Sequence, residues 1–144
     1  MVFESNSYEE TKNIGQQIAA KLHAGDILAL GGDLGAGKTV ITSGIAEYFG
    51  FVEGISSPTF TIVNQYDAPN ITLYHLDVYR IEKAEEMYDI GLEDMLYSDG
   101  ITIIEWAEKI EKLLPSTAIL VRMERDYSKG DNYRLITVDW GENR

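Results

Sequence analysis

The chain has 144 residues, enough for one domain with a sizeable core but too few for a nucleotide domain plus a separate substrate domain. Its 44% hydrophobic content is typical of globular proteins, and no apolar run approaches the roughly 18 residues of a membrane span. Twelve basic against 24 acidic residues leave a net charge of −12, which opposes unaided binding to nucleic acid.

The N-terminal residues contain neither the basic stretch nor the apolar stretch of a leader peptide, and the chain has no cysteine. We therefore expect one cytoplasmic domain over residues 1–144 that makes no membrane contact. The acidity has two interpretations, and both stay open. It serves solubility, or it forms an acidic docking face for a basic partner.

The first elements of the chain are predicted from capping and apolar spacing. A capping box at Ser7 and Glu10, followed by apolar residues at helical spacing, predicts a helix over residues 8–24. Residues 26–31, which contain the apolar run 27–30, predict a strand, and residues 38–49 predict a second helix. This order is half of a βαβ unit.

The residues between this strand and helix fit the phosphate-loop pattern G-x-x-x-x-G-K-S/T, and they read Gly32-Asp33-Leu34-Gly35-Ala36-Gly37-Lys38-Thr39. The glycines permit the backbone turns that point N–H groups at an anion. Lys38 adds a charge for the β- and γ-phosphates, and the Thr39 hydroxyl suits Mg²⁺. An incidental glycine-rich turn is the alternative, but the flanking strand and helix argue against it. We expect the nucleotide to contact Asp33, Leu34, Gly35, Ala36, Gly37, Lys38, Thr39 and Val40.

A hydroxyl-rich turn follows at residues 55–61. Pro58 holds Ser57 extended, which exposes the hydroxyl groups before a new strand begins. Thr59 or Thr61 could contact the γ-phosphate, as switch loops do in phosphate-loop proteins. An ordinary Ser/Thr/Pro turn explains the pattern equally well, so both interpretations stay open.

Two β-rich runs, residues 60–66 and 71–78, predict an antiparallel hairpin. Strand alternation places His75 and Asp77 on one face of a largely apolar strand. An unpaired carboxylate is costly there, so Asp77 needs a metal, a water or a basic partner. We favour a functional role for Asp77, and the alternative is a structural ion pair with Arg80 or His75.

The apolar strand predicted for residues 101–106 ends in an acid, Glu105, which is typical of a Walker B element. Ligands bind at the carboxyl ends of parallel strands, so Glu105 should share a rim with the phosphate loop. Because Asp77 lies on a strand predicted to be antiparallel and more peripheral, Glu105 and Thr39 are the expected Mg²⁺ ligands. The alternative is that Glu105 caps the helix predicted for residues 107–114.

The remaining predicted elements carry no motif that indicates chemistry. Residues 82–90 and 92–96 predict short helices, which form scaffold or a docking surface, and residues 118–121 and 136–140 predict two further strands. The fold class expected from all these elements is α/β.

These motifs occur in an order and at spacings that resemble the TsaE family of bacterial ATPases, which are needed for threonylcarbamoyladenosine synthesis on tRNA. The likeness extends over residues 8–140 and is carried by the phosphate loop, the Ser57–Thr61 turn, the segment His75-Leu76-Asp77-Val78-Tyr79-Arg80, and Ile104-Glu105-Trp106. It implies a P-loop NTPase fold with a mixed, mostly parallel central sheet that is flanked by helices and carries an antiparallel hairpin. It also implies partners, TsaB and TsaD, with tRNA reached only through their complex.

The resemblance also implies roles for individual residues. It assigns phosphate contacts to the loop and Lys38, Mg²⁺ contacts to Thr39 and Glu105, sensing or water orientation to Thr59 and Asp77, and nucleotide-side packing to Trp106. Core packing is the alternative for Trp106.

ATP is favoured over GTP because no guanine-reading N-K-x-D motif is present. Two other functions stay open: a small metabolite kinase, for which Arg122 and Arg125 could serve as lid residues, and a non-catalytic nucleotide-gated adaptor. The absence of an evident arginine finger other than Arg80 predicts slow hydrolysis without partners.

Overall fold

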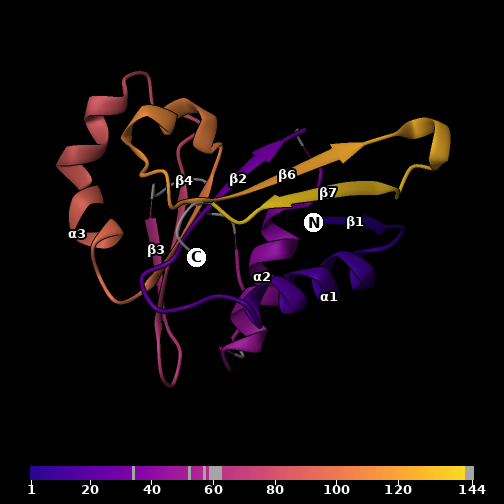
Figure 1. The fold of residues 1–144 in the computed structure, drawn as a ribbon, viewed down its shortest axis with the longest axis horizontal. Helices are drawn as coiled ribbons and strands as arrows, with labels where there is room; N and C mark the ends of the chain where they lie inside the picture. Colours follow the sequence, from indigo (N-terminus) through magenta and orange to yellow (C-terminus); the bar gives the residue numbers. More distant parts are fainter. Residues whose placement is uncertain (34, 52, 57, 59–62, 142–144) are drawn as a thin grey trace.

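The computed structural model describes residues 1–33, 35–51, 53–56, 58 and 63–141. These residues form one seven-stranded sheet in the order β1-β7-β6-β2-β5-β4-β3 (Figure 1). The strands are β1 (Val2–Ser5), β2 (Ile27–Gly32), β3 (Val63–Asp67), β4 (Thr72–Asp77), β5 (Ile101–Glu105), β6 (Ile119–Arg125) and β7 (Arg134–Asp139). The α-helices are α1 (Tyr8–Ala19), α2 (Lys38–Tyr48) and α3 (Leu92–Leu96), and the 3₁₀-helices are η1 (Ala84–Ile90), η2 (Ala107–Leu113) and η3 (Tyr127–Lys129).

The centre of the sheet is parallel and its edges are antiparallel. Strand β2 lies between β5 and β6 and is parallel to both, and β4 is parallel to β5. At one edge β3 is antiparallel to β4, and at the other β7 is antiparallel to β6 and β1 to β7. The predicted mixed, mostly parallel α/β sheet with an antiparallel hairpin is therefore confirmed. The carboxyl ends of β2, β4 and β5 meet at one rim.

Helices cover both faces of the sheet, because residues of the central strands are apolar on both sides. Leu28 and Leu30 of β2 pack in the core under α1 and α2. Ile27 and Ala29 of the same strand point the other way, into the core under η1, α3 and η2. Strand β2 is thus buried on both faces, which holds the loop after it on a rigid base.

Helices α1 and α2 cross in close contact through Gly15 and Gly44. A Cβ on Gly15 would lie 2.5 Å from the carbonyl oxygen of Ile41, and a Cβ on Gly44 would lie 2.2 Å from that of Lys12. Neither position has room for a larger residue unless the helices move apart. The predicted cap also forms, because the Ser7 side chain accepts a hydrogen bond from the Glu10 amide.

Several element boundaries differ from the predictions. Helix α1 ends at Ala19 rather than at residue 24, because the chain continues as a turn in which the Leu22 amide bonds to the Ala19 carbonyl. Leu22 is still buried, so the apolar spacing extends beyond the helix. The first short helix begins at Ala84 rather than at residue 82, and residues 107–113 form a 3₁₀-helix kinked at Ile110. Strand β1 was not predicted.

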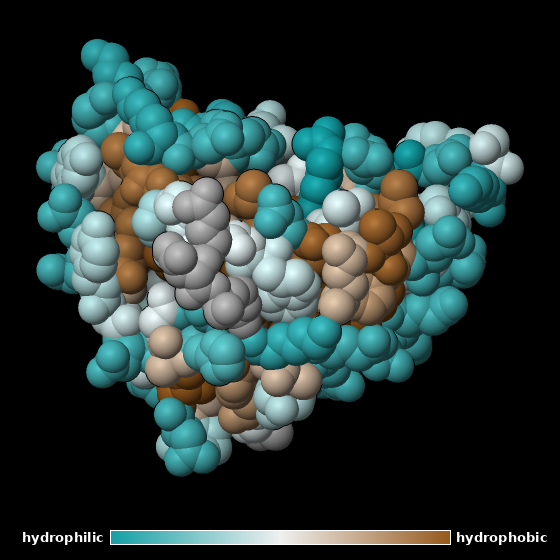
Figure 2. Space-filling model, in the orientation of Figure 1, coloured by the Kyte–Doolittle hydropathy of each residue, from teal (hydrophilic) through white to brown (hydrophobic). Residues whose placement is uncertain are grey.

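In the space-filling view, hydrophilic residues border the visible face, including the far end of the β6–β7 hairpin (Figure 2). No helix in the described ranges is long and apolar enough to cross a membrane.

Candidate functional site

The loop between β2 and α2 requires glycine at two positions. Gly32 has φ 117°, and a Cβ there would lie 2.0 Å from the carbonyl oxygen of Met123 on β6. Gly37 has φ 102° and is the N-cap of α2. Any other residue would be strained at either position. The glycines of the pattern therefore bring the loop close to β6 and begin the helix directly after it.

Lys38 lies folded over this loop. Its Nζ donates hydrogen bonds to the carbonyl oxygens of Gly32 (3.3 Å) and Asp33 (3.0 Å), and it lies 4.2 Å from the centre of the Trp106 ring. The side chain is only 5% exposed. Burial lowers the pKa of Lys38 below its ordinary value, against the opposing effect of nearby carboxylates, of which Glu105 is the strongest. The amine is thus a cation whose charge the protein alone incompletely compensates.

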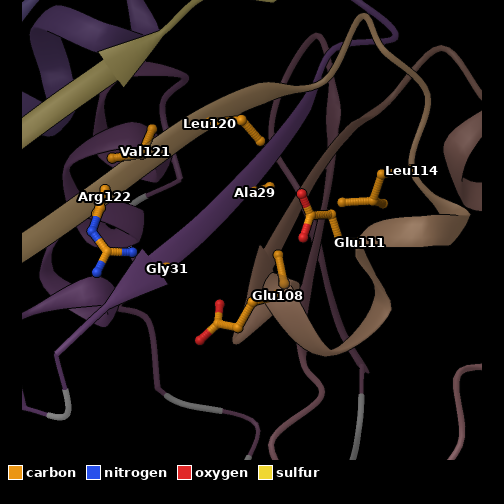
Figure 3. A pocket seen from close by; sticks show the side chains of 9 residues that line it. Ala29, Gly31, Glu108, Glu111, Leu114, Leu120, Val121 and Arg122 are labelled. Carbon is orange, nitrogen blue, oxygen red and sulfur yellow. The ribbon is translucent and has the colours of Figure 1, made fainter.

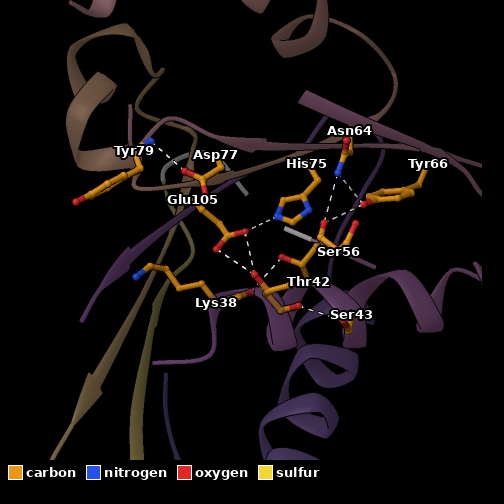
Figure 4. Close-up of polar contacts among 11 residues, drawn as sticks. Lys38, Thr42, Ser43, Ser56, Asn64, Tyr66, His75, Asp77, Tyr79 and Glu105 are labelled. Atoms are coloured by element: carbon orange, nitrogen blue, oxygen red, sulfur yellow. Dashed lines mark hydrogen bonds and ion pairs between the residues drawn. The ribbon is translucent and has the colours of Figure 1, made fainter. Parts of the chain in front are cut away.

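Thr39 and Glu105, the predicted metal ligands, are brought together. The Thr39 hydroxyl lies 3.4 and 3.3 Å from the two carboxylate oxygens of Glu105 and donates to them. Figure 4 shows the Glu105 carboxylate between His75 and the amine of Lys38. Glu105 is only 5% exposed, and these contacts fix its orientation. Its side chain faces the loop, and the following 3₁₀-helix has Trp106 as its N-cap without a side-chain cap, so the capping alternative is wrong.

His75 is a site residue for which the sequence had predicted no role of its own. Its Nε2 lies 2.5 Å from Oε2 of Glu105, and the side chain is fully buried. Nδ1 is buried and has no hydrogen-bond partner among the residues that the structure describes. A polar residue at an inward position of an apolar strand was the signal that pointed to it.

Asp77 lies on the strand next to that of Glu105. Strand β4 is parallel to β5, and Asp77 pairs in register with Glu105, which in turn pairs with Leu30 of β2. The predicted antiparallel hairpin of β3 and β4 is present, and β4 lies one strand further from β2 than β5 does. Strand β3 takes the edge, and the sequence did not indicate that β4 is also parallel to β5. Asp77 Oδ1 accepts a hydrogen bond from the Tyr79 amide at 2.9 Å. Both acids thus lie at the rim that carries the loop.

Trp106 lies at the site in an unusual backbone conformation. Of the described residues other than glycine, it alone has a positive φ, 61°. Its ring packs on Lys38 and lies 4.9 Å from the ring of Tyr79. A bulky residue in this region is strained, and such strain often marks functional sites. Trp106 therefore forms part of the wall of the site.

The outer side of the loop is bonded to the β6–β7 hairpin. The Asp33 amide donates to the Met123 carbonyl (2.9 Å), and Asp33 Oδ2 accepts from the Arg125 amide (2.8 Å). Arg125 Nη2 donates to the carbonyl of Gly35, and Arg134 Nε to that of Ala36 (2.9 Å). This role of the arginines was not predicted, because the contacts join residues about 90 positions apart and no local sequence pattern indicates them.

The other loop residues predicted to contact the nucleotide lie where expected: Asp33, Gly35, Ala36 and Gly37 lie in the loop, and Val40 lies in the first turn of α2. Their contacts with a ligand stay predictions. Leu34, Ser57, Thr59, Phe60 and Thr61 lie outside the described residues.

A cavity of about 220 Å³ lies nearby, between β2, β6 and η2 (Figure 3). Its walls are mostly aliphatic, and its charged side chains are Glu108, Glu111 and Arg122. Two carboxylates against one guanidinium disfavour a polyanion. The cavity is therefore unsuited to a triphosphate, although it borders Gly31 at the end of β2.

Hard oxygen ligands are present, but only a few of them come together. Within the described part of the chain, no group of three or more His, Cys, Asp or Glu side chains could hold a metal ion. The hydroxyl and carboxylate of Thr39 and Glu105 nevertheless fit Mg²⁺, which usually takes one or two protein carboxylates and completes its shell with water and phosphate. A structural zinc site would need more protein ligands.

Fold and site together define a mixed α/β protein with a glycine-rich loop and two carboxylates at the carboxyl rim of its parallel strands. Comparison with known proteins narrows this class. A family model described as "Threonylcarbamoyl adenosine biosynthesis protein TsaE" matches residues 5–136, and the chain belongs to this TsaE family.

Individual relatives agree with the family. A Bacillus subtilis (strain 168) protein named tRNA threonylcarbamoyladenosine biosynthesis protein TsaE is 43% identical, over 94% of this chain and 83% of its own length. Proteins of the same name from Rickettsia bellii and Treponema pallidum are 46% and 37% identical, covering 83% and 93% of this chain and 83% and 96% of their own lengths. The crystal structure of Bacillus subtilis YdiB superposes with a TM-score of 0.79 at 37% identity and covers 98% of this chain and 86% of that one.

Proposed function

We propose that this chain is a Mg²⁺-dependent ATPase subunit that acts in threonylcarbamoyladenosine modification of tRNA together with TsaB and TsaD. ATP binds at residues 33–40, and the chain alone hydrolyses it slowly. The observation that carries the proposal is the contact of Thr39 with Glu105 beside the Lys38 amine, because it joins a phosphate-binding loop to a metal-binding carboxylate.

Lys38 supplies the charge for the phosphates. Its amine bonds to two loop carbonyls, which are neutral partners. Phosphate oxygens form stronger, charge-assisted bonds with an ammonium group. Triphosphate binding therefore compensates a partly buried cation, and this favours a polyanion over a neutral ligand.

Glu105 and Asp77 have different roles in the proposed reaction. Glu105 is held by Thr39 and His75, so it faces the metal position, directly or through a water. When bound, Mg²⁺ neutralises charge on the β- and γ-phosphates. Asp77 lies beside Glu105 at the same rim and orients the attacking water or the segment that carries Thr59. The Trp106 ring lies against the Lys38 amine and forms one wall of the site.

The partners are inferred from the family and from charge. The relatives are named for tRNA threonylcarbamoyladenosine biosynthesis, and a chain of net charge −12 is a poor binder of tRNA by itself. Partner proteins supply the RNA-binding surface in this proposal. We expect full activity to depend on catalytic groups that the partners supply in trans.

The deciding experiment measures phosphate release from ATP by the chain alone, then with TsaB and TsaD, then with tRNA added. We expect slow release by the chain alone and at least a tenfold acceleration with the partners, since catalytic groups supplied in trans have large effects. Product analysis should find ADP and free phosphate. A phosphorylated metabolite would identify a kinase instead, and full turnover by the chain alone would contradict the dependence on partners.

A further inference from the structure

Different charged side chains flank the loop on the two sides of strand β2. On the β5 side lie the carboxylates of Glu105 and Asp77. On the β6 side lie Arg125 and Arg134, which pair across the β6–β7 hairpin and reach the loop carbonyls of Gly35 and Ala36. A triphosphate whose terminal phosphate and metal lie near Glu105 has its nucleoside end on the arginine side.

The two arginines differ in which of their nitrogen atoms form hydrogen bonds. Arg134 bonds to Ala36 and, through Nη1, to the carbonyls of Asp131 (2.9 Å) and Tyr133 (2.8 Å), so it fastens the hairpin to the loop. Arg125 bonds to Gly35 through Nη2, while its buried Nε has no hydrogen-bond partner in the described part of the chain. Neither guanidinium forms an ion pair with a carboxylate of the described residues.

Tyr127 lies next to Arg125 and is exposed. Its hydroxyl is 3.1 Å from Arg125 Nη1, and its ring centre is 5.7 Å from the guanidinium carbon. The side chain is 67% exposed, so core packing does not explain it. One guanidinium group therefore links an exposed aromatic ring to the backbone of the loop at Gly35.

We propose that Arg125 and Tyr127 form the nucleoside-binding side of the site and stack on the base of a bound nucleoside triphosphate. Aromatic rings and guanidinium planes both stack on nucleobases, with little preference for one base over another. This inference rests on the proposed nucleotide-binding function and adds the residues that hold the base. Phosphate binding by the loop does not require Tyr127.

The test compares a ligand with a base and one without. Mg-ATP and Mg-tripolyphosphate are titrated calorimetrically into the full chain and into Tyr127→Ala. We expect the substitution to weaken ATP binding about tenfold, the usual size of one lost base stack, and to change tripolyphosphate binding less than about twofold. Tyr127→Phe keeps the ring and should bind ATP within about twofold of the original chain.

The matched control is Tyr97→Ala, which removes an 81% exposed tyrosine after α3 and should alter neither affinity. Equal ATP affinity in Tyr127→Ala and the original chain would overturn the proposal. An equal loss of affinity for ATP and tripolyphosphate in Tyr127→Ala would also overturn it, since the tyrosine would then act on the loop. The same holds if Tyr127→Phe loses as much ATP affinity as Tyr127→Ala, since the ring would then be unimportant. If the original chain bound tripolyphosphate as tightly as ATP, the base contact would be refuted and the phosphate site would still be supported. If the original chain bound neither ligand, the proposed nucleotide function itself would be refuted.

Discussion

At the scale of single residues, the site holds two carboxylates with different surroundings. Glu105 accepts from the Thr39 hydroxyl and contacts His75, whereas Asp77 accepts from the backbone amide of Tyr79. Among the described residues, Glu105 contacts Thr39, the residue expected to bind the metal. The two acids pair in register, so their positions at the rim do not distinguish their roles. Their hydrogen-bond partners distinguish them.

This difference predicts distinct effects of removing each charge. Glu105→Gln keeps an oxygen that can accept from Thr39, so the fold should persist while the apparent Mg²⁺ affinity falls about tenfold or more. Asp77→Asn should leave the Mg²⁺ affinity within about twofold and slow phosphate release. Titration of Mg²⁺ at fixed ATP, with phosphate release as the readout, measures both.

Glu111→Gln, on the wall of the separate cavity, is the matched control and should change neither quantity. A loss of Mg²⁺ affinity in Asp77→Asn with none in Glu105→Gln would mean that the two acids exchange roles.

At the scale of elements, the close crossing of α1 and α2 supports the loop, because α2 begins directly after Gly37. Gly44→Ala would place a Cβ 2.2 Å from the Lys12 carbonyl oxygen. Overpacking of this kind outweighs the better helix propensity of alanine. We expect the free energy of unfolding to fall by about 1–3 kcal/mol, measured by urea denaturation.

Ser43→Ala, at the neighbouring position of α2, controls for the loss or gain of a single small group and should change stability by less than about 1 kcal/mol. An unchanged urea midpoint in Gly44→Ala would mean that the helices separate without cost and that the close crossing does not stabilise the fold.

Some of these elements could be predicted from local sequence patterns, and others could not. The strand before the loop, the helix after it and the buried β5 follow from apolar runs and glycines, and each forms close to its predicted bounds. Strand β1 is four residues long, lies at an edge and pairs only with β7, so its short sequence contains no distinctive alternation. The parallel pairing of β4 with β5 joins residues about 28 positions apart, and hairpin signals cannot reveal it.

The residues of the candidate site also differ in whether their positions could be predicted from the sequence. The loop, Lys38, Thr39 and Glu105 were predictable, because a motif or a strand end indicates each of them. The arginines that hold the loop were not predictable in that role, because their contacts arise only when β6 pairs beside β2. His75 was noticed as a polar residue in an apolar strand, but its partner depends on the β4–β5 register.

At the scale of the whole molecule, the negative charge is unevenly distributed along the chain. Seven of the 24 acidic residues and only one basic residue lie between positions 82 and 99, around η1 and α3. The stretch 119–139, which contains the β6–β7 hairpin, has equal numbers of each. The half of the molecule that carries η1 and α3 therefore repels polyanions most, while the arginine side of the loop does not.

The measurement that tests the central claim most directly is calorimetric titration of Mg-ATP into the original chain and into Lys38→Met. The fold lowers the pKa of Lys38, so it disfavours the charged amine. The resulting loss of folding free energy is complete below that lowered pKa and disappears as pH rises towards the ordinary value. Methionine removes the charge and keeps most of the stem, so the variant should unfold at the same temperature or higher. We predict one ATP site per chain, with affinity reduced at least tenfold in Lys38→Met. A folded Lys38→Met chain that binds Mg-ATP as tightly as the original would contradict the claim that the loop holds the triphosphate.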